Sequence, residues 1–142
     1  MIVVDSSVWV DYFNGVDTSQ TATLDALLGV APVAIGDVIL TEVLQGFRQD
    51  ADYRTAKRLL TSLIVYDMLG THQAVKSAEN FRALRKLGIT TRKTIDVIIA
   101  TFCIERRHML LFSDRDFTPF VEHFGLRCAG PQGAIALANC AA

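Results

Sequence analysis

The sequence predicts an α/β protein with a central, mainly parallel sheet flanked by helices. Short apolar segments that resemble buried strands alternate along the chain with segments of helical periodicity. The strand segments are apolar throughout rather than alternating with polar residues, which is typical of strands covered on both faces. With 142 residues, 51% of them hydrophobic, the chain is expected to form one domain over residues 1–142 with a substantial core.

The chain begins with a predicted strand and two predicted helices. Residues 2–5 (IVVD) form a short apolar run that ends in an acid. Residues 6–15 (SSVWVDYFNG) can start a helix with Ser6 or Ser7 as its cap and Gly15 after its end. Residues 18–29 combine a Thr/Ser start, leucines at helical spacing and a glycine stop, which indicates a second helix.

The middle of the chain continues the alternation of strands and helices. Residues 32–36 (PVAIG) predict a short strand, and residues 37–47 predict a helix capped by Asp37. The amphipathic pattern of residues 50–63 predicts another helix. The apolar run IVYDM, residues 64–68, predicts the next strand.

The last part of the chain supplies two more helices and two more strands. Residues 71–88 predict a long helix capped by Thr71 and ended by glycine, and residues 94–107 predict a largely apolar helix. Residues 108–114 (HMLLFSD) form a strand that ends in acids. Residues 125–129 (GLRCA) predict a final edge strand.

Acidic residues fall at places that such a fold brings together. Three of them follow the carboxyl ends of predicted strands, and two lie near helix N-termini, which point to the same edge of the sheet. Two of the five, Glu42 and Asp96, lie in apolar stretches of sequence. Burying an unpaired carboxylate costs about 2 kcal/mol or more, or else the carboxylate takes up a proton. The five acids are Asp5, Glu42, Asp96, Asp114 and Asp116.

A hard divalent cation would explain clustered carboxylates. Carboxylates held close together repel one another unless a cation lies between them. Mg²⁺ and Mn²⁺ prefer oxygen ligands and retain waters, and such a metal can polarise a phosphoryl oxygen and activate a water. Taken singly, each acid also has an ordinary structural interpretation: Asp5 as an N-cap, Asp96 as a first-turn residue, Glu42 as a solvated helix residue, and Asp114 and Asp116 as turn formers.

Charge is distributed unevenly along the chain. The net charge is −1, but the first 47 residues contain no Lys or Arg. A basic group precedes Asp96 and could follow a nucleic-acid backbone, although a solvated helix face is the alternative interpretation. The candidate RNA-binding residues are Arg85, Lys86, Arg92, Lys93 and Arg115.

The segments IVVDSSVWVDYF, LTEVLQGF, TIDVIIA and LLFSDRDF, in this order, resemble the PIN-domain ribonucleases, and among them the VapC-type toxins of toxin–antitoxin pairs. The resemblance runs from Ile2 to about Phe120 and implies a Rossmann-like PIN fold. It implies a Mg²⁺- or Mn²⁺-dependent endoribonuclease (a hydrolase) that forms a homodimer and is neutralised by a small cognate antitoxin.

The same resemblance assigns roles to residues of this chain. Asp5, Glu42 and Asp96 match the central acidic triad, and the fourth acid is Asp114 or Asp116, which both fit the family pattern. Ser6 matches a hydroxyl position that supports the site, and Ser113 is a weaker candidate of that kind. We expect Asp5 and Asp96 to bind the metal directly, with Asp114 or Asp116 binding directly or through water. Glu42 is then expected to orient or deprotonate the attacking water.

Rival classes make different demands on the sequence. A receiver domain needs paired acids after the first strand, and a haloacid-dehalogenase-like phosphatase needs Asp-x-Asp there, where this chain has a serine. A metal-binding interaction module without nuclease activity, a metal-free one and a DNA-cleaving relative remain as alternatives. A positively charged leader is absent and the three cysteines are odd in number and far apart, so we expect a cytoplasmic protein without a disulfide framework and without a membrane association.

Overall fold

A computed structural model describes residues 1–130. Within them the strands form one parallel sheet of five, in the order β3-β2-β1-β4-β5. The strands are β1 (Ile2–Val4), β2 (Val33–Gly36), β3 (Ile64–Tyr66), β4 (Met109–Leu111) and β5 (Arg127–Cys128). The α/β class and the final edge strand are therefore confirmed, and every pair is parallel.

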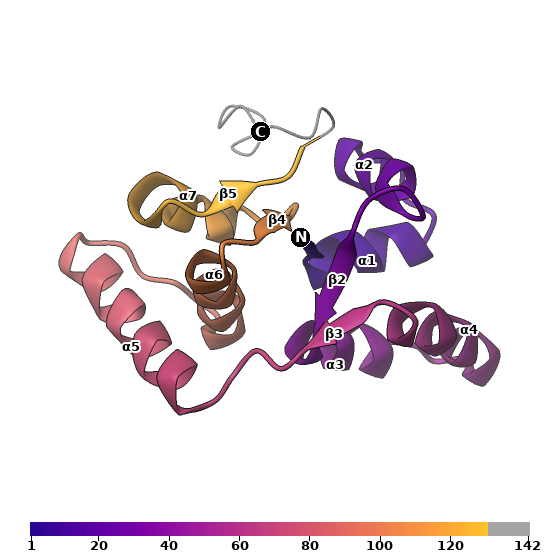
Figure 1. Cartoon of the computed structure of the whole chain (residues 1–142), viewed down its shortest axis with the longest axis horizontal. Helices are drawn as coiled ribbons and strands as arrows, with labels where there is room; N and C mark the ends of the chain where they lie inside the picture. Colours follow the sequence, from indigo (N-terminus) through magenta and orange to yellow (C-terminus); the bar gives the residue numbers. More distant parts are fainter. Residues whose placement is uncertain (131–142) are drawn as a thin grey trace.

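Helices cover both faces of this sheet. Figure 1 places α1 to α4 on one side and α5, α6 and α7 on the other. The helices are α1 (Ser6–Phe13), α2 (Ser19–Leu27), α3 (Asp37–Gln45), α4 (Asp50–Thr61), α5 (Thr71–Lys86), α6 (Thr94–Arg106) and α7 (Thr118–Phe124), with a short 3₁₀ turn, η1 (Arg115–Phe117). Both η1 and α7 lie between residues 114 and 125, where the sequence predicts neither a helix nor a strand.

The strand order has a topological switch point at β1. The chain moves outward from β1 through β2 to β3, and then returns to the other side of β1 to form β4. Strand β1 is thus paired with β2 and β4, in register at Ile2↔Val33 and Val3↔Leu110. Ligands of open α/β sheets bind outside the carboxyl ends of the strands at such a switch point.

The helix caps differ from the sequence prediction at three places. Asp5, rather than Ser6 or Ser7, caps α1 with its side chain. Gly36 and Gly70 are the N-caps of α3 and α5, where the sequence suggested Asp37 and Thr71. Because an acid or hydroxyl just inside a helix looks the same in sequence as one at the cap, the pattern misplaces these caps by one residue.

Asp37, which the sequence predicts as a helix cap, instead connects the start of α3 to another part of the chain. Its Oδ1 accepts hydrogen bonds from the backbone N–H of Val38 at 2.8 Å and of Met68 at 3.0 Å. The second bond connects the start of α3 to the loop that follows β3. This contact fixes the helix that carries Glu42 against the neighbouring strand.

The apolar core lies on both faces of the sheet. Its largest fully buried side chains include Trp9 on α1, Ile35 on β2 and Phe102 on α6. Burial of a side chain of this size stabilises the fold by roughly 1.5–3 kcal/mol. Of the described cysteines, Cys103 is a free, buried thiol and Cys128 is disulfide-bonded, which the number and spacing of the cysteines argued against. None of the helices in residues 1–130 is long and apolar enough to cross a membrane.

Candidate active site

Asp5 connects the end of β1 to the start of α1. It is 2% exposed, and its Oδ2 accepts hydrogen bonds from the Ser7 backbone N–H at 3.1 Å and from Ser7 Oγ at 2.6 Å. The Ser7 hydroxyl in turn accepts the backbone N–H of Ser113, which follows β4, at 3.3 Å. One serine therefore fixes the Asp5 carboxylate and links the carboxyl ends of β1 and β4.

Asp96 lies in the first turn of α6, as predicted, and is 5% exposed. The residues that follow it in the helix are buried nearly all round, so Asp96 begins a helix that is packed firmly on the sheet. Its Oδ2 has no hydrogen-bond partner among residues 1–130. This buried, unpartnered oxygen needs a cation or a proton.

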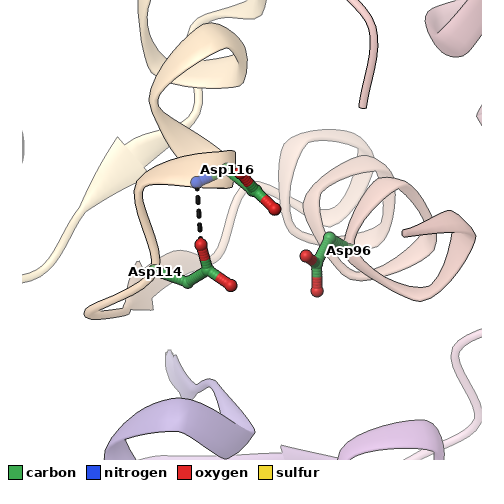
Figure 2. Close-up of side chains that lie close together, drawn as sticks. All are labelled: Asp96, Asp114 and Asp116. Carbon is green, nitrogen blue, oxygen red and sulfur yellow. Dashed lines mark hydrogen bonds between the residues drawn. The ribbon is translucent and has the colours of Figure 1, made fainter. Parts of the chain in front are cut away.

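Asp114 and Asp116 come from the turn that follows β4. The Asp116 backbone N–H donates to Asp114 Oδ1 at 3.0 Å, so the first acid caps the short η1 turn that carries the second. Figure 2 shows both side chains beside Asp96, with the Asp116 carboxylate directed toward it. One ligand oxygen from each of these three residues lies within 4.8 Å of the others.

Glu42 reaches the site from α3, on the opposite face of the sheet from α6. Its carboxylate is half-buried and accepts a hydrogen bond from Ser6 Oγ at 3.1 Å. The charge of Asp5 raises the pKa of Glu42, and the charge of Glu42 contributes to the raised pKa of Asp96. All five acids predicted from the sequence therefore gather at one edge of the sheet, while their roles stay a prediction.

Burial and mutual repulsion make these carboxylates hard to ionise. Burial, reinforced by the charge of Asp5, raises the pKa of Asp96 to about 7. Burial also raises the pKa of Asp5, against the lowering effect of its hydrogen bonds from Ser7. The pKa of Glu42 is raised by burial and by Asp5, although the Ser6 hydrogen bond opposes the shift. A cation bound among these carboxylates would therefore favour their ionised forms.

Two basic side chains at the start of α6 face this negative charge. Lys93 Nζ lies 3.6 Å from Asp114 Oδ2, and Arg92 lies 3.4 Å from Asp116 Oδ2. Asp96, Asp114 and Asp116 together raise the pKa of Lys93, with Asp96 contributing most. Both basic side chains are more than half exposed, so they can also reach a ligand at the rim.

The remaining predicted basic residues lie farther from the acids or make no contact with them. Arg85 and Lys86 lie at the end of α5, where the Arg85 guanidinium stacks on the Phe81 ring at 5.6 Å. Arg115 opens η1 and is exposed. Their contact with RNA stays a prediction.

Sequence reasoning missed Ser7 and emphasised its neighbours. Ser6 donates a hydrogen bond to Glu42, Ser7 donates to Asp5, and Ser113 contributes its backbone N–H to the site. The signal for Ser7 was present, because an N-cap aspartate commonly accepts the N–H two residues later.

The three close acids fit a divalent metal. Asp5 Oδ1 and Asp96 Oδ2 are both buried and have no partner among the described residues. Asp96, Asp114 and Asp116 supply three carboxylate oxygens at a separation suitable for one ion. Asp5 lies outside this close set, although its charge contributes to the raised pKa of Asp96.

Comparison with known proteins shows the family of the chain. The PIN-domain family model matches residues 2–120. Ribonuclease VapC11 of Mycobacterium tuberculosis (strain H37Rv) is 31% identical over 134 residues, which cover 91% of this chain and 98% of the relative. A VapC ribonuclease of Mycobacterium bovis matches to the same extent.

Solved structures share the fold at lower identity. VapBC2 from Rickettsia felis, bound to a DNA fragment from its promoter, has a TM-score of 0.71 at 19% identity and covers 90% of this chain and 97% of its own. VapC20 of Mycobacterium tuberculosis, described as a sarcin-ricin loop cleaving toxin, has a TM-score of 0.58 at 19% identity and covers 84% of this chain and 94% of its own. The chain belongs to the PIN-domain family, and within it to the VapC-type ribonuclease toxins.

Proposed function

We propose that the protein is a Mg²⁺- or Mn²⁺-dependent endoribonuclease, the toxin of a type II toxin–antitoxin module, formed as one PIN domain over residues 1–142. The observation that carries this proposal is the convergence of five acids on one strand edge, where buried oxygens of Asp5 and Asp96 have no partner among residues 1–130. Membership in the VapC-type ribonucleases supplies the reaction class.

Asp96, Asp114 and Asp116 would hold the metal, with Asp5 completing the site. Once bound, a divalent cation neutralises the carboxylates, polarises the phosphoryl oxygen and stabilises the charge on the leaving oxygen. The apolar packing of α6 keeps Asp96 in place, and the Ser7 hydrogen bonds keep Asp5 in place. The site is thus arranged before the ion arrives, which suits electrostatic catalysis.

Glu42 is the proposed general base. Its raised pKa makes it a better proton acceptor than an exposed carboxylate, and its hydrogen bond from Ser6 restricts its orientation. The attacking water gives a proton to Glu42 as the water oxygen attacks phosphorus in line. The bond from phosphorus to the 3′ oxygen breaks, and the 3′ oxygen takes up a proton from solvent. The products then carry a 5′-phosphate and a 3′-hydroxyl.

Basic residues are proposed to bind the RNA strand on the way to the acids. Arg92 and Lys93 are adjacent to the site acids, and Arg115 lies in η1 between Asp114 and Asp116. Arg85 and Lys86 continue the positive charge at the end of α5. Contacts of this kind make RNA affinity depend on salt.

We also propose a small antitoxin partner and a homodimer. Several solved neighbours are toxin–antitoxin assemblies, among them VapBC of Salmonella typhimurium with a TM-score of 0.66 and VapBC-1 of nontypeable Haemophilus influenzae with a TM-score of 0.69. A toxin that cleaves cellular RNA acts in the cytoplasm, so we place the protein there.

The chemistry of the RNA ends tests this mechanism. Purified protein with Mn²⁺ should leave 5′-phosphate and 3′-hydroxyl ends, and Glu42→Gln should lower the cleavage rate by roughly 10²- to 10⁴-fold with little loss of metal affinity. A 2′,3′-cyclic phosphate would contradict the mechanism, because that product requires attack by the 2′-hydroxyl of the RNA. Cleavage of DNA but not RNA would mean that the substrate is DNA, and the proposed metal site would still stand.

A further inference from the structure

A groove between α5 and α6 lies beside the site described above. Its volume is about 390 Å³, within the range of roughly 300–1,000 Å³ typical of small-molecule sites. The two helices lie side by side in Figure 1. One wall is the first turns of α6, at Thr94, Val97 and Ile98, so Asp96 and the groove share the N-terminal end of one helix.

The other wall of the groove is one face of α5. Ala74 and Ala78 leave space, and the Phe81 ring provides a flat apolar surface. The guanidinium of Arg85 lies 5.6 Å from the centre of this ring, and Arg82 also lines the groove. The lining includes no acidic residue.

Ser77 gives the groove a polar group without a partner. The residue is 6% exposed and lines the groove, and its Oγ has no hydrogen-bond partner among residues 1–130. One turn earlier on the same helix, the buried Gln73 Oε1 also has no hydrogen-bond partner among the described residues. Buried polar atoms are satisfied in nearly all native structures, so we expect the Ser77 hydroxyl, which the empty groove leaves almost inaccessible, to gain a partner when a ligand displaces the side chains around it.

We propose that this groove binds a base of single-stranded RNA that flanks the cleaved phosphate. A base offers flat faces for stacking on Phe81 and polar edges for the Ser77 hydroxyl, while Arg82 and Arg85 contact adjacent phosphates. This inference rests on the proposed ribonuclease function and adds a source of sequence preference to it.

A second copy of the chain is a less suitable occupant of the groove. In a two-fold symmetric interface the same surface patch meets itself, so the Arg82 and Arg85 charges of both copies would gather in one contact without acids in the lining to compensate them. The positive rim and apolar interior instead match the alternation of phosphates and bases along a single strand.

Two substitutions test the groove. Ser77→Ala should change the base preference at one position beside the cut by roughly 2- to 10-fold, as expected for one lost hydrogen bond. Its Tm should stay unchanged or rise, because an unpartnered buried hydroxyl is removed. Ala78→Leu should fill the groove and weaken RNA binding several-fold. Ala51→Leu, an exposed alanine on α4, is the matched control and should change neither property.

Cleavage preference is read by sequencing the products of a randomised RNA, and affinity is measured in the inactive Asp96→Asn background. Unchanged preference and unchanged affinity in both variants would overturn the proposal. Conversion of a dimer to a monomer by Ala78→Leu in light scattering would also overturn it, since the groove would then hold a second copy. If the wild-type chain cuts no RNA, the nuclease function fails, but weaker RNA binding by Ala78→Leu would still support the groove.

Discussion

At the scale of single residues, the site depends on acids that basic side chains of the protein neutralise only in part. Asp5 and Asp96 each retain a buried oxygen without a partner among residues 1–130, while Lys93 and Arg92 are the nearby cations. These two side chains pair with Asp114 and Asp116, which are also candidate metal ligands. A divalent metal and the basic side chains therefore compete for the same carboxylates.

Replacing Lys93 should change metal and RNA binding in opposite directions. Lys93→Gln removes a positive charge beside Asp114, so Mn²⁺ affinity should rise by roughly 2- to 5-fold, the range expected of an exposed ion pair. RNA affinity should fall, because a phosphate contact is lost. Calorimetric titration of Mn²⁺ and filter binding of RNA measure the two effects, with Lys57→Gln on α4 as the control. A decrease in both affinities would mean that Lys93 is needed to build the site.

The two serines after Asp5 should prove to have separate roles. Ser7→Ala removes the 2.6 Å hydrogen bond to Asp5 and leaves the Ser113 N–H without its acceptor, so it should cost about 1–3 kcal/mol of unfolding free energy and weaken metal binding. Ser6→Ala should lower the cleavage rate through Glu42 and leave metal affinity unchanged. Urea unfolding and Mn²⁺ titration separate the two, and equal effects on metal affinity would contradict these roles.

The sequence predicted which acids converge but not how they are held. Their placement follows from the alternation of strands and helices, because that pattern defines one strand edge. The roles of Ser7, Asp37 and Lys93 depend on contacts across 106, 31 and 21 residues of sequence with Ser113, Met68 and Asp114 respectively. Local patterns carry no information about such pairings.

At the scale of elements, the junction between β2 and α3 sets the position of Glu42. Gly36 ends β2 and caps α3, and a Cβ added there would lie 2.0 Å from Met68 Sδ and 2.5 Å from its Cγ. Met68 is fully buried, and its backbone N–H donates to Asp37. The glycine is therefore required by close packing rather than by its backbone angles.

A pair of glycine substitutions at the two ends of α3 tests this packing. Gly36→Ala should lower the unfolding free energy by about 1–3 kcal/mol, since overpacking forces Met68 to move. Gly46→Ala, whose Cβ would meet its nearest atom at an ordinary 3.5 Å, should change stability by no more than about 0.5 kcal/mol. Urea denaturation of both variants makes the comparison, and equal stabilities would mean that Met68 has room to shift.

Element prediction succeeded where periodicity was strong and failed where the segment was short. The long helices α4 and α6 begin at the predicted residues, and the cap of α5 lies one residue before the predicted one. The seven-residue α7 was missed because it follows the acidic turn directly, and its apolar residues Phe120 and Val121 pack on the core instead of marking a strand.

At the scale of the whole molecule, burial of the acids links stability to pH and to metal. The folded protein raises the pKa of Asp5, Glu42 and Asp96, so between the usual carboxyl range and about pH 7 the folded state binds more protons than the unfolded state. The unfolding free energy of the metal-free protein should therefore fall as pH rises through this window. The full stabilising effect of the three carboxyl groups is present only below the pKa values that they have in the unfolded chain.

Metal should reverse this dependence. Because Mn²⁺ binds the ionised carboxylates, the stabilisation that it provides should grow from pH 5.5 to pH 8. Thermal unfolding at several pH values, with EDTA and with excess Mn²⁺, measures both trends. Asp96→Asn should weaken the pH dependence of both the metal-free stability and the stabilisation by Mn²⁺. A metal-free protein that becomes more stable between pH 5.5 and pH 8 would show that the acids are already paired in the fold.

The central claim is tested most directly by RNA cleavage with the purified chain, free of any antitoxin. Structured RNA is incubated with Mg²⁺ or Mn²⁺, with an EDTA control and beside Asp96→Asn. We predict cleavage that requires the metal and is lost in the variant, which would place Asp96 in the catalytic site. Absence of RNA cleavage together with no metal-induced rise in Tm would contradict the account and make the acids structural.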